Sequence, residues 1–206
     1  MPVTPILDEL ELDALTELIN LGVSQAATSL RDMSGREVLL TVPRVLMVPR
    51  LEAVETLRER EPGLLVGIRQ DFTGDISGKA LLIFPNAKSF DLVRAVVSDP
   101  LPEEDIAALQ HEALSEIGNI ILNGWFATIA NQLDRTFQMS LPAVSRGDAA
   151  HVLQLSGDPV GGQVLFLYIN FTIQDHDIRG YMAIVMDVPV ISSLKVLLQD
   201  YIARMT

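Results

Sequence analysis

Apolar residues recur every three to four positions in two long stretches of the chain, about residues 7–31 and 103–132. This spacing is the period of an α-helix with one buried face, so both stretches are predicted to be long amphipathic helices. The apolar stripe of the first comprises Leu12, Leu15, Ile19, Val23, Ala26 and Leu30, and that of the second comprises Leu114, Ile117, Ile121, Trp125 and Ile129. We expect these side chains to face the core.

Shorter apolar runs follow each predicted helix, and they are typical of strands. Glycine and aspartate separate the last two runs of each half, which favours short turns and antiparallel pairing. The predicted strands are 36–48, 64–72, 78–85, 135–146, 163–173 and 180–187. Shorter helices are predicted at 50–60, 86–98, 147–154 and 188–203.

The same order of elements therefore occurs twice, and the sequence itself repeats. Glu17 matches Glu116 and Asn20 matches Asn119, each 99 positions later. An internal repeat of this length indicates a duplicated structural unit. We predict an α+β fold with pseudo-twofold symmetry, in which an antiparallel sheet packs against the two long helices. One domain, 1–206, is expected to contain both repeats, about 7–100 and 103–206.

Composition excludes several function classes. The chain has 206 residues, a formal net charge of −12 and no cysteine. Such acidity disfavours binding to nucleic acid or anionic lipid, and the lack of cysteine removes disulfides and thiolate chemistry. The three histidines are far apart in sequence, so we expect no metal site in the protein itself. Without a signal-like leader or a long apolar run, a soluble cytoplasmic protein is predicted.

Polar residues gather on the side of each long helix that is opposite the apolar stripe. Glu17 and Asn20 are i, i+3 neighbours, so their side chains can reach one spot. Asp13 lies one turn earlier, and the second helix repeats the cluster with Glu112, Glu116 and Asn119. A single exposed pair of this kind is usually just solvated surface. Asparagine is nevertheless unfavourable in mid-helix, and its recurrence after glutamate in both halves argues for a function, although duplication alone could also produce it.

These residues resemble the motif of the CheC, CheX and FliY chemotaxis phosphatases, Asp/Ser-x3-Glu-x2-Asn-x22-Pro. The first half matches every position, from Asp13 to Pro43. The second half matches at Glu116, Asn119 and Pro142, whereas Glu112 stands where the family has Asp or Ser. Two motifs without a C-terminal flagellar-switch module are most similar to CheC.

The resemblance implies a hydrolase that removes the phosphoryl group from an aspartyl-phosphate receiver of the CheY kind. By this resemblance, Asn20 and Asn119 would orient the attacking water. Glu17 and Glu116 would pair with a lysine of the receiver. We expect both amides to be exposed. Magnesium is expected to be supplied by the receiver, so the protein would need no cofactor of its own.

The remaining motif positions have two interpretations. Both Asp13 and Glu112 are candidate partner-binding residues. Asp13 either contacts the partner beside the site or is a solvated acid that favours the helix dipole. Glu112 adds negative charge beside Glu116, which either hinders the approach of an acidic receiver or changes nothing. Pro43 and Pro142 are interpreted as structural residues that limit strand pairing or shape a bulge.

Two other function classes remain open. One is a binding module without catalysis in the chemotaxis or flagellar switch system, for example a partner of the deamidase CheD, as the resemblance to CheC-like proteins implies. The other is a hydrolase for a small molecule, which no nucleophile–base arrangement supports. A monomer or weak homo-oligomer is expected, because an internal pseudo-dimer is already complete.

Overall fold

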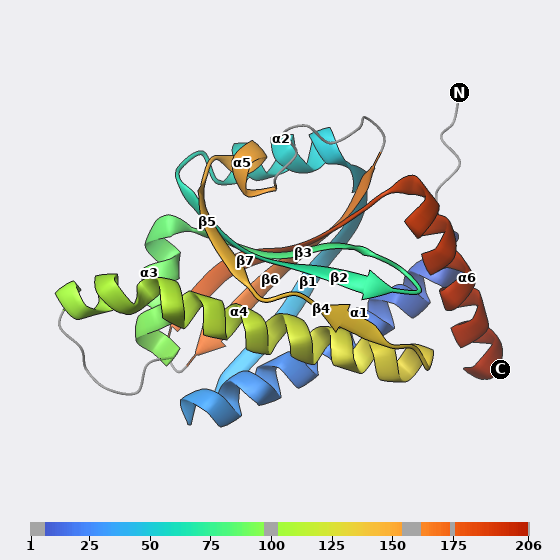
Figure 1. The fold of residues 1–206 in the computed structure, drawn as a ribbon, viewed down its shortest axis with the longest axis horizontal. Helices are drawn as coiled ribbons and strands as arrows, with labels where there is room; N and C mark the ends of the chain where they lie inside the picture. The colour runs from blue at the N-terminus through green and yellow to red at the C-terminus, as the bar shows by residue number, and fades with distance from the viewer. Residues whose placement is uncertain (1–6, 97–102, 154–161, 174–175, 206) are drawn as a thin grey trace.

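The computed structural model describes residues 7–96, 103–153, 162–173 and 176–205 (Figure 1). Its two long helices, α1 (Glu9–Ser34) and α4 (Glu103–Leu133), lie side by side on one face of a seven-stranded antiparallel sheet. Helices α2 (Arg50–Arg60) and α5 (Ala149–Val152) cover the opposite face. The predicted α+β fold with an antiparallel sheet is confirmed.

Strands of the two halves are interleaved in the sheet. The order is β1 (Val38–Pro49), β6 (Gln163–Ile173), β7 (His176–Met186), β3 (Gly78–Pro85), β2 (Leu65–Gly74) and β4 (Phe137–Met139), while β5 (Ala143–Gly147) also pairs with β2. The hairpins β6–β7 and β3–β2 lie side by side at the centre of the sheet. The first strand of each half therefore pairs with the hairpin of the other half. Helices α3 (Asn86–Val96) and α6 (Val188–Met205) contact α4 and α1, respectively.

Both motif prolines lie where strand pairing is interrupted. In β1, Thr41 pairs with Asn170 but Arg44 pairs with Tyr168, so the register shifts by one residue around Pro43. Pro142 lies in the break between β4 and β5. Because proline has no N–H to donate to a ladder, it suits these irregular positions. The predicted structural role of both prolines is confirmed.

Some predicted boundaries are wrong for physical reasons. The expected single strand 135–146 is divided into two, because the ladder stops around Pro142. The expected helix 147–154 is a single turn, 149–152, and Gln154 lies outside the described residues. The last strand begins earlier than predicted, at His176, because it pairs with β6 up to Ile173.

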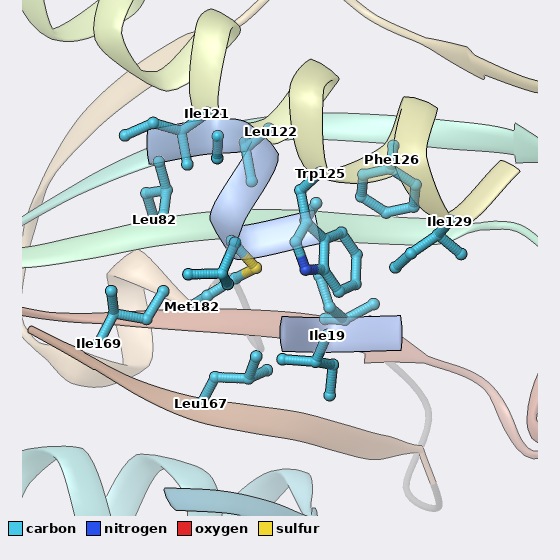
Figure 2. Packing of buried hydrophobic residues seen from close by; sticks show 14 of the residues in the cluster. Ile19, Leu82, Ile121, Leu122, Trp125, Phe126, Ile129, Leu167, Ile169 and Met182 are labelled. Carbon is cyan, nitrogen blue, oxygen red and sulfur yellow. The ribbon is translucent and has the colours of Figure 1, made fainter. Parts of the chain in front are cut away.

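The main core lies between the sheet and the α1–α4 layer (Figure 2). All predicted stripe positions are buried except Leu12, which remains 40% exposed in the first turns of α1. Glu11 is buried instead, at 1% exposure, because α6 packs over this end of the helix and supplies polar partners. A second, smaller core lies between the sheet and α2 and α5.

The two long helices meet at small residues. A Cβ added to Gly22 of α1 would lie only 2.4 Å from Cδ1 of Trp125 in α4. Figure 2 shows the Trp125 ring reaching from α4 toward Ile19 of α1. Phe126 packs edge-to-face against Trp125, at 4.9 Å between ring centroids. This close approach fixes the position of one motif-bearing helix relative to the other.

Candidate functional site

The first motif lies on the solvent side of α1. This helix begins with a capping box, in which the Asp8 side chain accepts from the Glu11 N–H and Glu11 accepts from the Asp8 N–H, both at 2.9 Å. With its start fixed and its apolar stripe buried, α1 exposes Asp13, Glu17 and Asn20. The structure thus brings the three predicted residues together on one accessible face.

The Asn20 carboxamide points to solvent without a restraint from its surroundings. Among the described residues, its side chain makes no hydrogen bond, and the nearby Ser24 hydroxyl donates to the Asn20 backbone oxygen at 2.9 Å. Both the oxygen and the amino group of this carboxamide are therefore available to a partner.

Glu17 has a neighbour that the sequence did not indicate, Tyr201 of α6. Burial raises the pKa of the Tyr201 hydroxyl, and the negative charge of Glu17 raises it further. Tyr201 is 5% exposed, so its side chain is packed inside the protein beside the first motif and does not project into solvent.

The second motif differs from the first at its asparagine. Glu112 and Glu116 are exposed on α4, as predicted, but Asn119 is only half exposed. Its Oδ1 accepts hydrogen bonds from Nδ2 of Asn123 at 2.8 Å and from Nε2 of Gln70 at 3.2 Å. The expectation that both amides are exposed is therefore wrong for Asn119, whose oxygen faces the sheet.

Gln70 explains this difference between the halves. It is 1% exposed in β2, on the sheet face that α4 covers, and it also donates to the backbone oxygen of Ser140 at 2.7 Å. Ser140 donates its backbone N–H to the backbone oxygen of Asp71. Thr41 is the residue that matches Ser140 in the repeat, and Thr41 pairs with Asn170. The position equivalent to Gln70 is therefore Ile169, which has no polar group to offer to α1.

Of the residues that contact the two motifs, the sequence could have indicated some but not others. Asn123 is four residues after Asn119, so helical spacing alone could have indicated their contact. Gln70 is 49 residues away from Asn119, and no local pattern relates the two. Tyr201 likewise reaches Glu17 only through the packing of α6 on α1.

A metal site and a membrane span each require a particular arrangement of residues. Within the residues that the structure describes, no group of three or more His, Cys, Asp or Glu side chains is arranged to hold a metal ion. No described helix is long and apolar enough to cross a membrane.

Two family descriptions match parts of the chain that carry the motifs. Residues 10–47, which contain the whole first motif, match the CheC-like family. Residues 66–163, which contain the second motif, match the chemotaxis phosphatase CheX.

Curated relatives are distant. The chain is 24% identical over 141 residues to the CheY-P phosphatase CheC of Bacillus subtilis, covering 66% of each protein. It is 20% identical over 181 residues to the flagellar motor switch phosphatase FliY of the same organism, covering 84% of this chain. The matched region spans only 66% of that CheC and 45% of that FliY.

Solved structures share the fold. The crystal structure of FliY from Thermotoga maritima superposes with a TM-score of 0.72 at 19% identity, covering 98% of this chain and 100% of the chain in that structure. CheX in the CheX–CheY–BeF3–Mg2+ complex of Borrelia burgdorferi gives 0.53 at 16% identity, covering 82% and 98%. The fold is thus shared with FliY and CheX, and the two motifs lie within the regions that match the CheC-like and CheX descriptions. The resemblance of this chain to the CheC, CheX and FliY family is confirmed.

Proposed function

We propose that this protein is a phosphatase that hydrolyses the aspartyl phosphate of a CheY-like receiver. The observation that carries the proposal is the exposed Glu17–Asn20 pair on α1, repeated as Glu116–Asn119 on α4. Distant relatives named as CheY-P phosphatase and flagellar motor switch phosphatase support the same activity. A structural relative that was crystallised with CheY supports the receiver as partner.

The proposed chemistry is positioning of the nucleophile. Hydrolysis requires a water in line with the departing carboxylate, and an aligned nucleophile lowers the barrier by several kcal/mol. The Asn20 oxygen would accept from that water, and its amino group would donate toward a phosphoryl oxygen. Because the amide is neutral, it does not repel the anionic phosphate. The magnesium ion is proposed to come with the receiver.

Glu17 and Glu116 are proposed to orient the receiver by pairing with its lysine. Both carboxylates are exposed, so docking would remove them from water together with their partner. Such a pair is stronger than a surface pair, although desolvation offsets part of the gain. Asp13 and Glu112 are also exposed, and we propose that they contact the receiver at the edge of each docking face.

The two sites are proposed to be unequal. Both lone pairs of the Asn119 oxygen are occupied, by Asn123 and Gln70. To accept from water, this carboxamide must give up at least one hydrogen bond, each of which contributes about 0.5–1.5 kcal/mol. Asn20 carries no such cost. The first site is therefore expected to supply the larger share of activity.

The test is the decay of a phosphorylated CheY-type receiver with magnesium, with and without this protein. Faster decay at substoichiometric protein is expected, because a catalyst turns over. Tight binding of receivers or of a CheD-type deamidase, without faster decay of any receiver tested, would instead establish the non-catalytic binding module.

A further inference from the structure

A polar cavity lies on the sheet face opposite the two motif-bearing helices. Its volume is about 500 Å3. The floor consists of Tyr168 and Tyr181, a directly opposed pair on β6 and β7 whose ring centroids are 5.6 Å apart. Arg60 and Glu61, at the C-terminal end of α2, form one wall.

Three arginines converge on this cavity. The guanidinium carbons of Arg60 and Arg44 lie 4.5 Å and 5.8 Å from the centroid of the Tyr168 ring. Arg179 lines the cavity from β7, two residues before Tyr181 and on the same face. Among the described residues, none of the three arginines forms an ion pair.

The Pro43 bulge is what directs Arg44 to this cavity. Continuing the register of Thr41 with Asn170 would place Arg44 opposite Leu167, whose side chain belongs to the core on the other face. The one-residue shift places Arg44 opposite Tyr168 instead, so both side chains project from the same face.

Among the described residues, the arginine at the equivalent place of the other half is paired with an acid. In the repeat, Ala143 matches Arg44 and Arg69 matches Tyr168. Ala143 pairs with Arg69 just as Arg44 pairs with Tyr168. Arg69 forms a two-pronged ion pair with Asp71, at 2.7 and 2.6 Å. Asn170, a neutral residue of β6, occupies the position equivalent to Asp71. The arginine cluster is therefore not a simple consequence of the duplication.

The charges indicate the class of ligand. Three arginines against the single carboxylate of Glu61, which accepts from the Tyr181 hydroxyl at 2.6 Å, leave a local charge of +2 in a chain of net charge −12. A phosphate group carries about −1.5 to −2 near neutral pH and matches the forked donors of arginine. We propose that this cavity binds a small phosphorylated molecule, a site separate from the receiver-docking faces.

Calorimetric titration of the whole protein with inorganic pyrophosphate tests this proposal. Saturable 1:1 binding is expected, and Arg44→Gln, Arg60→Gln and Arg179→Gln should each weaken it about tenfold, as expected for loss of one charge-assisted contact. Arg58→Gln is the matched control, because Arg58 is exposed on α2 but does not line the cavity. Unchanged melting temperatures would show that the variants fold.

Three results would overturn the proposal. The first is a titration that does not saturate up to about 10 mM pyrophosphate, where binding is too weak to matter. The second is a loss of pyrophosphate affinity in Arg58→Gln equal to that in the cavity variants. The third is tighter binding of the dicarboxylate malonate than of pyrophosphate. No receiver is present in this titration, so its outcome is independent of the proposed phosphatase activity.

Discussion

Gln70 donates a hydrogen bond to the side-chain oxygen of Asn119 across 3.2 Å, and the opposite half has Ile169 at the corresponding position. This polar residue of the sheet, together with Asn123, makes the two motif asparagines chemically different. The side-chain oxygen of Asn119 is engaged within the protein, whereas the exposed Asn20 leaves both of its polar atoms available.

Releasing the Asn119 oxygen should increase activity at the second site. In an Asn20→Ala background, Asn123→Ala removes the 2.8 Å hydrogen bond to that oxygen. The rate of receiver dephosphorylation should rise about 2- to 10-fold, the equivalent of one hydrogen bond of about 0.5–1.5 kcal/mol.

Ser24→Ala in an Asn119→Ala background is the matched control. Ser24 is the counterpart of Asn123 in the first half, but its hydroxyl donates to the backbone oxygen of Asn20 and not to its side chain. This change should leave the rate as it was. If Asn123→Ala lowered the rate instead, the network would be shown to prepare Asn119 for catalysis rather than restrain it.

The helix crossing should respond in opposite directions to the same substitution at two glycines. Gly22→Ala would place a methyl group 2.4 Å from the buried Trp125 ring and should destabilise the protein by about 1–3 kcal/mol. At Gly124, the nearest atom would be an ordinary 3.6 Å away, so Gly124→Ala should gain up to about 1 kcal/mol of helix propensity. Urea denaturation measures both changes. Equal midpoints for the two variants would contradict the tight crossing.

Glu11 should make stability depend on pH. Burial acts to raise the pKa of its carboxyl, but hydrogen bonds from the Asp8 backbone, Gln199 and Lys195 outweigh this effect and hold the pKa below 4.5. A lowered pKa stabilises the folded state above the unfolded value of 4.5, and this contribution is lost as the pH falls through the folded pKa.

Thermal melting of Glu11→Gln should therefore show a lower Tm than wild type at pH 7, and the difference should narrow below pH 4.5. Glu9→Gln serves as comparison, since Glu9 is an exposed acid of the same first turn. An equal Tm difference at pH 3 and pH 7 would mean that Glu11 acts through packing and not through its charge.

Much of the fold was predictable because its signals are local or repeated. The period of apolar residues indicated both long helices, and the turn residues indicated the antiparallel hairpins. The repeat placed Pro43 and Pro142 at equivalent positions, where both interrupt strand pairing. Helical spacing also sufficed to place Glu17 and Asn20 on one exposed face.

The differences between the halves were not predictable, because long-range partners create them. Asn119 is withdrawn from solvent by Gln70, which is 49 residues away in sequence. Glu11 replaces Leu12 in the buried stripe because α6, from the far end of the chain, supplies Lys195 and Gln199. A helical wheel contains no information about such partners.

Positioning of the attacking water by the side-chain amides of α1 and α4 can be measured through receiver dephosphorylation rates. The variants are Asn20→Ala, Asn119→Ala and the double variant, with thermal melting and receiver binding measured alongside. We expect a larger loss of activity for Asn20→Ala than for Asn119→Ala. The double variant should not accelerate decay, while its fold and receiver binding persist. A double variant that is as active as wild type would show that these amides do not position the water.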